Sequence, residues 1–205
     1  GLCGSDMHAY LGHDERRPAP LILGHEASGV VVGGKKDGKN VVINPLVSCG
    51  VCGACLSGRA NLCNEREIIS MPPRQGAFAE QIAVPEKNLI EIPKKLDLKV
   101  AALAEPLATA WHAVALSGQH SARPLAEATA LVIGSGAVGL GSALVLKNFG
   151  CSRIIIAETN PLRRQTAEHA GFNTVVDPNH KHALAEGFAN IVIDAVGNKG
   201  TRLAS

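Results

Sequence analysis

The segment from Ala128 to Gly150 places a glycine-rich loop between an apolar strand-like run and an apolar helix-like run. Gly134, Gly136 and Gly139 follow the G-x-G-x-x-G spacing. The first glycine makes the turn, the second lets the backbone approach a pyrophosphate, and the third lets helix and strand pack closely. N–H groups at the start of the helix can then bind phosphates, so the loop predicts a dinucleotide site. The cofactor-binding residues predicted in this loop are Gly134, Gly136, Ala137, Val138 and Gly139.

An acidic residue follows the loop at the distance expected for a ribose contact. Glu158 ends the next strand-like run, nineteen residues after Gly139. A carboxylate there would bond a ribose 2′-hydroxyl and repel a 2′-phosphate, which predicts NAD as the cofactor. Arg163 and Arg164 keep NADP open as the alternative. Arg163 is counted among the predicted cofactor-binding residues, and the alternative for both arginines is a solvated helix face.

The second half of the chain alternates strand-like and helix-like segments. This alternation is typical of βαβ units and a parallel sheet, here a doubly wound Rossmann sheet in an α/β protein. Such a sheet usually has six strands, and the sequence shows four, so we expect it to be incomplete. The strands are expected at 128–134, 152–158, 173–178 and 190–197, and the helices at 135–150 and 160–171.

The first half is expected to be a β-rich unit. Short apolar runs alternate with Gly, Pro and Asn, which is typical of short strands and turns. A domain boundary is expected near residue 117, which gives domains at 1–116 and 117–205. The strands are expected at 27–32, 40–47, 78–85 and 88–93, and a helix is expected at 98–116, with Pro106 as its kink or its start.

Composition narrows the class of partner. The chain has 20 basic and 18 acidic residues and a formal net charge of +2, which predicts neither nucleic-acid nor membrane-surface binding. No apolar run is expected to reach bilayer-spanning length, and we expect a cytoplasmic protein. The first residue is not Met, and the last residues closely follow a strand-like run. We therefore expect a fragment of a longer protein.

Four of the six cysteines lie within fifteen residues. Their spacing is C-x2-C-x2-C-x7-C, and in a reducing cytoplasm such a cluster predicts a metal site more than disulfides. Four thiolates fill a tetrahedral shell and leave no position for substrate, so we interpret the lobe at about 46–66 as a structural zinc site. An iron–sulfur cluster is the chemical alternative. The four expected ligands are Cys49, Cys52, Cys55 and Cys63.

A second group of chemically versatile residues is spread along the chain. Each has an ordinary explanation alone, because a lone Cys is usually a small core residue. The motifs are G-L-C-G-S-D-M-H at the start of the chain, G-H-E at 24–26 and A-E-P-L at 104–107.

Together with the cysteine lobe and the glycine loop, these motifs resemble the zinc-dependent medium-chain dehydrogenases. The five matches occur in that family's order and cover nearly the whole chain, and A-E-P-L resembles the polyol branch that includes sorbitol and L-idonate dehydrogenases. The resemblance implies a GroES-like catalytic domain beside a Rossmann domain and two zinc ions per chain, one catalytic and one structural. It also implies a homodimer or homotetramer for a full-length protein.

The resemblance assigns roles to individual residues. Cys3 and His25 would ligate the catalytic zinc, and the remaining protein ligand would be Glu26 or Glu105, between which the sequence does not choose. Asp6 would accept a hydrogen bond from His25 and fix its tautomer. The other assigned residues are Ser5 and His8, which would carry the proton to solvent, and Thr109, which would lie beside the nicotinamide.

The reaction implied is hydride transfer from a secondary alcohol of a polyol, sugar acid or sugar phosphate to NAD. The alternatives are a threonine or primary-alcohol dehydrogenase on the same scaffold, and a zinc- and nucleotide-binding protein without turnover. Arg16 and Arg17 lie between two active-site motifs, where they would meet an acidic or phosphorylated substrate or simply form a solvated loop. Cys151 is expected to be a packed core thiol.

Overall fold

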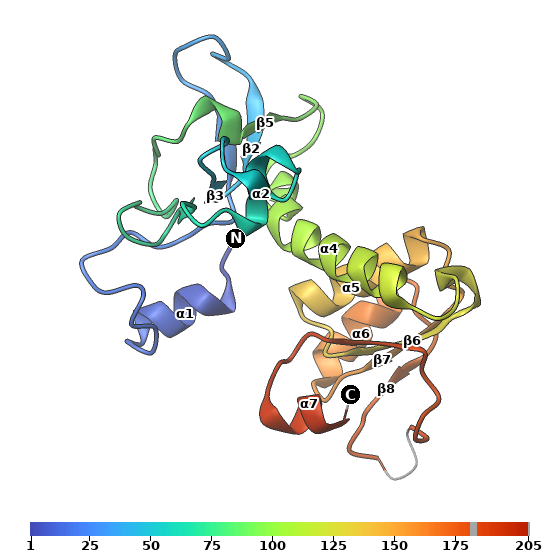
Figure 1. The fold of residues 1–205 in the computed structure, drawn as a ribbon. Coiled ribbons are helices and arrows are strands. Elements are labelled where there is room, and N and C mark those ends of the chain that lie inside the picture. The colour runs from blue at the N-terminus through green and yellow to red at the C-terminus, as the bar shows by residue number, and fades with distance from the viewer. Residues whose placement is uncertain (181–183, 205) are drawn as a thin grey trace. The chain divides into compact units, whose positions relative to one another are not determined.

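The computed structural model describes residues 1–180 and 184–204, and these form two compact units (Figure 1). Unit 1 covers Gly1–Glu105 and unit 2 covers Pro106–Ser205. The helix α4 (Ala104–His120) begins at the end of unit 1 and continues into unit 2. The boundary expected from the sequence, after residue 116, falls later within this helix.

Unit 1 is built from short elements, as its Gly- and Pro-rich sequence predicts. Two small antiparallel sheets form, one with the order β1-β2-β5 and one that pairs β3 with β4. In the larger sheet, Val42 lies opposite Ser28 on one side and Ile90 on the other. The elements are α1 (Gly4–Tyr10), β1 (Ser28–Val30), β2 (Asn40–Ile43), β3 (Leu46–Val47), α2 (Gly53–Leu56), η1 (Ala60–Leu62), β4 (Glu67–Ile68), η2 (Glu86–Asn88), β5 (Leu89–Glu91) and α3 (Leu98–Ala101).

The strand predicted at 78–85 does not form, and that prediction is wrong. Residues 79–84 and 27–34 line a cavity of about 690 Å³ instead of pairing with each other. A strand needs a partner within hydrogen-bonding distance, and open space takes the partner's place here. The predicted strand at 40–47 is also divided, because Asn44 and Pro45 separate β2 from β3.

Unit 2 confirms the predicted parallel sheet. Its order is β8-β7-β6-β9, and every pairing is parallel. The strand that comes first in the sequence lies between the second and the fourth, with the third beyond the second, which is the order of a Rossmann half. The elements are η3 (Leu125–Glu127), β6 (Thr129–Ile133), α5 (Ala137–Asn148), β7 (Arg153–Ala157), α6 (Pro161–His169), β8 (Val175–Val176), β9 (Ile191–Asp194) and α7 (Lys199–Ala204).

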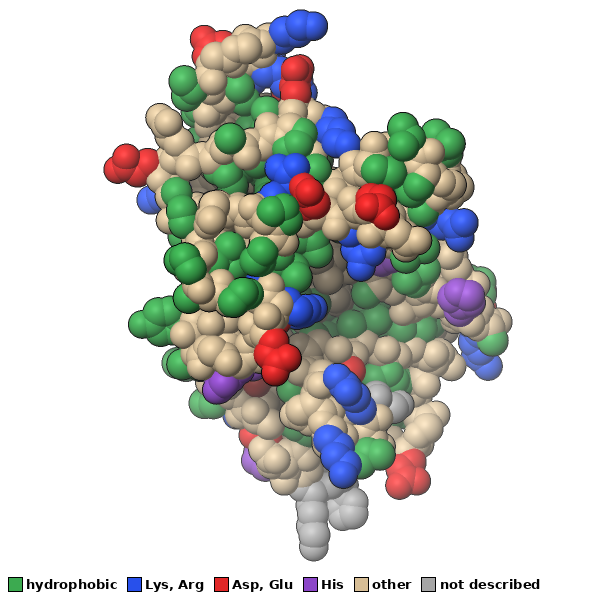
Figure 2. Space-filling model, turned by 60° about the vertical axis from the view of Figure 1, so that its left-hand side comes forward, with side chains coloured by type: hydrophobic (Ala, Val, Ile, Leu, Met, Phe, Trp, Pro, Cys, Tyr) green, Lys and Arg blue, Asp and Glu red, His purple; other side chains and the backbone are tan. Residues whose placement is uncertain are grey.

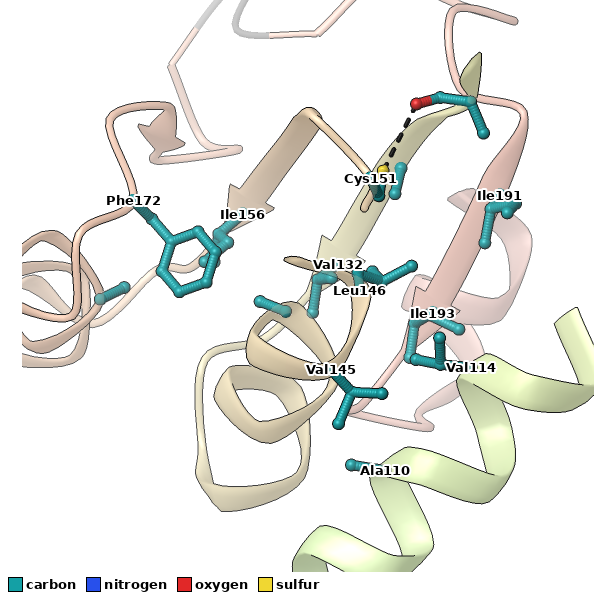
Figure 3. Packing of buried hydrophobic residues seen from close by; sticks show 14 residues of the cluster. Ala110, Val114, Val132, Val145, Leu146, Cys151, Ile156, Phe172, Ile191 and Ile193 are labelled. Carbon is teal, nitrogen blue, oxygen red and sulfur yellow. Dashed lines mark hydrogen bonds between the residues drawn. The ribbon is translucent and has the colours of Figure 1, made fainter. Parts of the chain in front are cut away.

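Both faces of this sheet are buried, since alternate residues of β6 point into two different clusters. Ala130 and Val132 pack into the larger cluster with residues of α4 and α5 (Figure 3). Leu131 and Ile133 belong to the second cluster. Cys151 is 3% exposed within the larger cluster, and its Sγ donates to the Ala128 carbonyl at 3.4 Å. The predicted core thiol is therefore confirmed.

The helix α6 begins and ends where local chemistry predicts. The Asn160 side chain accepts from the N–H groups of Leu162 and Arg163 at 2.9 and 3.2 Å, and Pro161 occupies the first turn. Gly171, with φ of +87°, follows the helix, in a conformation that favours glycine. The strand expected next at 173–178 is shorter than predicted and covers only Val175–Val176.

One prediction about apolar segments is wrong. Leu98–His120, a stretch of 23 residues that includes α3 and α4, is long and apolar enough to cross a membrane by length and composition alone. Core helices of globular proteins meet the same test. Two residues of α4, Ala110 and Val114, are fully buried in the core of unit 2. We therefore interpret α4 as a packing helix of the domain.

The surface view agrees with the balanced composition. On the face drawn in Figure 2, Lys and Arg side chains are interspersed with Asp and Glu side chains, and no large patch of one sign is visible.

Candidate functional site

The cysteine lobe brings its four sulfur atoms together, all within 4.8 Å of one another. The Cys52 and Cys55 sulfurs are 3.5 Å apart, and the Cys49 and Cys55 sulfurs are 3.9 Å apart. Four thiolates at the corners of a tetrahedron around zinc would be ~3.8 Å apart, given a Zn–S distance of ~2.3 Å. The donor set therefore fits zinc, and all six cysteines of the chain are free thiols.

Backbone N–H groups support this cluster. The N–H groups of Val51 and Cys52 hydrogen-bond to the Cys49 sulfur and lower the pKa of that thiol to about 6. The Cys63 sulfur, on a fully buried residue, accepts from the Cys49 N–H at 3.4 Å. The loop thus stabilises the Cys49 thiolate, the form that ligates metal, by its own hydrogen bonds.

The second candidate centre is organised around Asp6, which is 1% exposed on α1. Its Oδ2 accepts from the Cys3 N–H at 3.0 Å, and its Oδ1 accepts from the Gly24 N–H at 3.2 Å. The Nδ1 atom of buried His25 lies 3.3 Å from Asp6 Oδ1, although its direction falls short of a formed hydrogen bond. One carboxylate therefore fixes both ends of the chain segment that joins Cys3 to His25.

Three potential ligands converge beside this carboxylate. The ligand atoms of Cys3, His25 and Glu26 all lie within 4.8 Å of one another. One thiolate, one imidazole and one carboxylate fit a zinc site with three protein ligands and an open position. The burial of Glu105 raises its pKa, and Glu26 and Asp6 add to that effect while His25 opposes it. Among the described residues, Glu105 is near this group without being one of its three members.

The predicted proton carriers share α1. Ser5 is half-buried, and His8, three residues later, is exposed. Residues three apart lie on the same face of a helix. The His8 and His13 rings lie 6.4 Å apart. Thr109 is exposed on α4 in unit 2.

The glycine loop has the shape that its sequence predicts. A Cβ on Gly139 would lie 1.9 Å from the Gly134 carbonyl oxygen, so only glycine allows the helix to pack this closely. A Cβ on Gly136 would meet nothing within 4 Å, which leaves open space at the start of α5. No side chain caps that helix, and its first N–H groups can serve an anion. The open space and free N–H groups fit a pyrophosphate.

Glu158 has a second role that the sequence analysis missed. Glu158 is 5% exposed, and its carboxylate accepts from the Ser135 N–H at 2.8 Å and the Asn160 N–H at 2.8 Å. Burial alone would raise the pKa of Glu158, but these two N–H groups and the charge of Arg163 hold it below its usual range. The carboxylate therefore ties the glycine loop to the start of α6. A polar residue between the first two glycines was the available signal.

The two neighbouring arginines differ. Arg164 Nη1 donates to the carbonyls of Glu158 and Thr159 at 2.8 and 2.7 Å, and to Asp177 at 3.0 Å. Its guanidinium is therefore committed to the protein. Arg163 is exposed and remains the candidate for a cofactor contact.

Comparison with known proteins agrees with this geometry. The family profile described as the alcohol dehydrogenase GroES-like domain matches residues 1–94, which confirms the predicted GroES-like domain. The chain is 35% identical to (R,R)-butanediol dehydrogenase of Saccharomyces cerevisiae, over 91% of this chain and 56% of that protein. It is also 35% identical to L-galactonate-5-dehydrogenase of Escherichia coli, over 97% of this chain and 60% of that protein. The chain thus spans less than two thirds of either relative.

A solved structure extends the likeness to both units. A zinc-binding dehydrogenase of Sinorhizobium meliloti, crystallised with NADP, has a TM-score of 0.86 and 32% identity, over 98% of this chain and 61% of that one.

Proposed function

The chain belongs to the zinc-dependent medium-chain dehydrogenase family, and we propose that the protein transfers hydride from a secondary alcohol of a polyol, sugar acid or sugar phosphate to NAD. The observation that carries this proposal is the convergence of Cys3, His25 and Glu26 within 4.8 Å. The names of the two relatives, a butanediol dehydrogenase and a galactonate dehydrogenase, support a secondary alcohol as the substrate.

Each residue of the centre has a proposed task. Cys3 and Glu26 supply anionic donors, and His25 supplies a neutral nitrogen. Asp6 holds His25 in the tautomer that presents Nε2, because its carboxylate lies 3.3 Å from Nδ1. A bound zinc ion would supply Lewis acidity, which makes a coordinated hydroxyl easier to deprotonate.

The proton is proposed to leave along α1. Ser5 accepts it through its hydroxyl, and His8 passes it to solvent, since His8 is exposed while Ser5 is half-buried. An imidazole suits this task because it can accept a proton and release it again, as a proton shuttle does.

Unit 2 is proposed to hold NAD. The backbone of Gly136, Ala137 and Val138 would hold the pyrophosphate, since no Cβ fills the space beside Gly136. Glu158 favours NAD over NADP, because a buried carboxylate with a lowered pKa repels a 2′-phosphate. Thr109 is proposed to lie beside the nicotinamide, and exposed Arg163 beside the adenosine ribose.

Two further parts of the proposal concern the cellular compartment and the oligomeric state. Six free cysteines, four of them gathered as metal ligands, suit a reducing compartment, so we place the protein in the cytoplasm. We also propose that the full-length protein forms a homodimer or homotetramer.

The test is a screen of NAD reduction with the full-length protein, against polyols, sugar acids, sugar phosphates, primary alcohols and threonine. We expect NADH from at least one secondary alcohol of the first three classes, together with two zinc ions per chain. A protein with a single zinc ion and no NADH from any substrate would support zinc and nucleotide binding without turnover. NADH from threonine or primary alcohols alone would favour those substrates.

A further inference from the structure

Arg17 is a buried cation. Arg16 and Arg17 are adjacent, yet 70% of the Arg16 side chain is exposed and only 6% of the Arg17 side chain. The solvated loop that the sequence allowed is therefore correct for Arg16 and wrong for Arg17. A guanidinium is charged at all physiological pH values, so burial of Arg17 places a permanent positive charge inside unit 1.

The buried guanidinium has unused hydrogen-bond donors. Arg17 Nε and Nη1 are both shielded from solvent, and neither has a hydrogen-bond partner among the described residues. These two atoms carry three N–H donors. A buried charge is normally paired and hydrogen-bonded, so three unused donors on one cation are a rare arrangement.

The nearest acidic group is already engaged. Asp14 Oδ2 is 3.9 Å from Arg17 Nε, which is beyond hydrogen-bonding distance. Arg16 binds both oxygens of Asp14, with Nε at 2.9 Å from Oδ1 and Nη2 at 3.1 Å from Oδ2. The Arg16 N–H adds a third bond to Oδ1 at 3.1 Å. One carboxylate thus serves two guanidinium groups, and the excess positive charge belongs to Arg17.

Arg17 belongs to the chain segment that Asp6 holds at both ends, beside Cys3 and beside His25. It lies in the segment between α1, which follows Cys3, and His25. Asp6 accepts from Gly24 at one end of this segment and from Cys3 just before its other end. Within this segment, the Arg17 N–H donates to the Asp14 carbonyl at 3.0 Å and closes a turn that fixes the Arg17 backbone.

We propose that Arg17 binds the carboxylate or phosphate group of an anionic substrate. The proposal rests on the proposed function and selects sugar acids and sugar phosphates over neutral polyols. Carboxylates and phosphates are the ligands that guanidinium donors match best, and an anion would supply both the missing charge and the missing acceptors.

The binding test uses the full-length protein and no turnover. Thermal unfolding is measured with inorganic phosphate, with gluconate, with sorbitol as a neutral control, and with sodium chloride at matched ionic strength. We expect phosphate or gluconate to raise the melting temperature of the wild type and of Arg16→Gln, but not of Arg17→Gln. Arg17→Lys keeps the charge with fewer donors and should retain part of the shift.

The kinetic test compares substrates that share a secondary alcohol and differ in charge. Arg17→Gln should raise KM for the anionic substrate about tenfold or more, and leave KM for the neutral polyol within about twofold. The same anion dependence in Arg17→Gln as in the wild type would overturn the proposal. A lower melting temperature in Arg17→Gln with no anion effect on the wild type would also overturn it, since Arg17 would then pair with a carboxylate of the protein itself.

The two proposals fail separately. Arg17-dependent stabilisation by anions, with no NADH from any substrate, would contradict the proposed function and leave the anion site standing. NADH from anionic and neutral substrates, with the KM for the anionic substrate the same in Arg17→Gln as in the wild type, would contradict the Arg17 proposal alone.

Discussion

Two groups of side chains in the described part of unit 1 suit a metal ion, and they are assembled differently. The cysteine lobe, Cys49 to Cys63, draws all of its donors from fifteen consecutive residues. The centre formed by Cys3, His25 and Glu26 joins residues more than twenty positions apart, and it depends on Asp6 to hold them.

The difference in assembly corresponds to a difference in chemistry. The lobe offers four thiolates, which fill a tetrahedral shell, whereas the centre offers three donors of different kinds and leaves one position open. The lobe stabilises its own thiolate through backbone N–H groups, while the centre relies on a buried carboxylate behind the imidazole. A closed site can shape a loop, and only an open site can take a substrate.

The largest effect is expected when one thiol is removed from each of the two sites in turn. Cys3→Ala should lose one zinc ion and essentially all NADH production while the lobe keeps its metal. Cys55→Ala should lose the other zinc ion and lower the melting temperature, and the protein that stays folded should still produce NADH. Zinc per chain, NADH formation and thermal unfolding are the measurements.

Cys151→Ala is the matched control, because Cys151 is buried outside both clusters. It should keep two zinc ions per chain. Two zinc ions in Cys3→Ala would refute the assignment of Cys3 to the open site.

The second prediction tests which carboxylate completes the open site. Glu26→Gln should weaken zinc binding at the open site, formed with Cys3 and His25, by more than about 100-fold. Residues that only support a ligand typically contribute about 10–100-fold. Glu105→Gln should weaken it less, because Glu105 lies outside the group of three. Zinc affinities are measured by competition with a chelator. The reverse order would make Glu105 the ligand and Glu26 its support.

The third prediction concerns Asp6, the buried carboxylate that supports His25 and has no counterpart in the cysteine lobe. Asp6→Asn keeps an acceptor for Gly24 but removes the charge that faces His25 Nδ1 at 3.3 Å. We expect about 10–100-fold weaker zinc binding at the open site and unchanged zinc in the lobe. Circular dichroism checks that α1 persists, and an equal loss of zinc from both sites would mean that unit 1 had unfolded.

Sequence predicted best what depends on neighbouring residues. The spacing of the four cysteines and the glycine loop are local patterns, and each has the predicted geometry. The parallel sheet was predictable for the same reason, because strand-like and helix-like segments alternate along the second half of the chain.

Sequence failed where the answer depends on distant segments. The run at 78–85 has a strand-like composition, but only Phe78 bonds a neighbouring segment, at the Leu23 carbonyl, and residues 79–84 line a cavity. Arg17 and Arg16 are equally polar, and only tertiary packing buries one of them. The choice between Glu26 and Glu105 has the same origin, since A-E-P-L and G-H-E are local motifs that do not report their distance from Cys3.

The smallest expected effect tests whether Cys49 in the lobe is already a thiolate in the metal-free protein. The N–H groups of Val51 and Cys52 lower the pKa of Cys49 to about 6, so in the metal-free protein this thiol is mostly thiolate at pH 7. Its alkylation rate should be nearly constant from pH 8 to pH 7 and fall to half near pH 6, because only the thiolate reacts. Burial raises the pKa of Cys151, which should stay unreactive over the whole range.

Mass spectrometry of peptides alkylated with iodoacetamide measures both rates in one sample. A midpoint near 8.5, the value of an ordinary thiol, would show that the metal-free loop loses its hydrogen bonds. The lobe would then need its metal to form, and it would no longer differ from the open centre in being organised by its own backbone. A midpoint near 6 would sharpen the contrast between the two sites. The cysteine lobe would then stabilise the Cys49 thiolate without metal, whereas the centre of Cys3, His25 and Glu26 depends on Asp6.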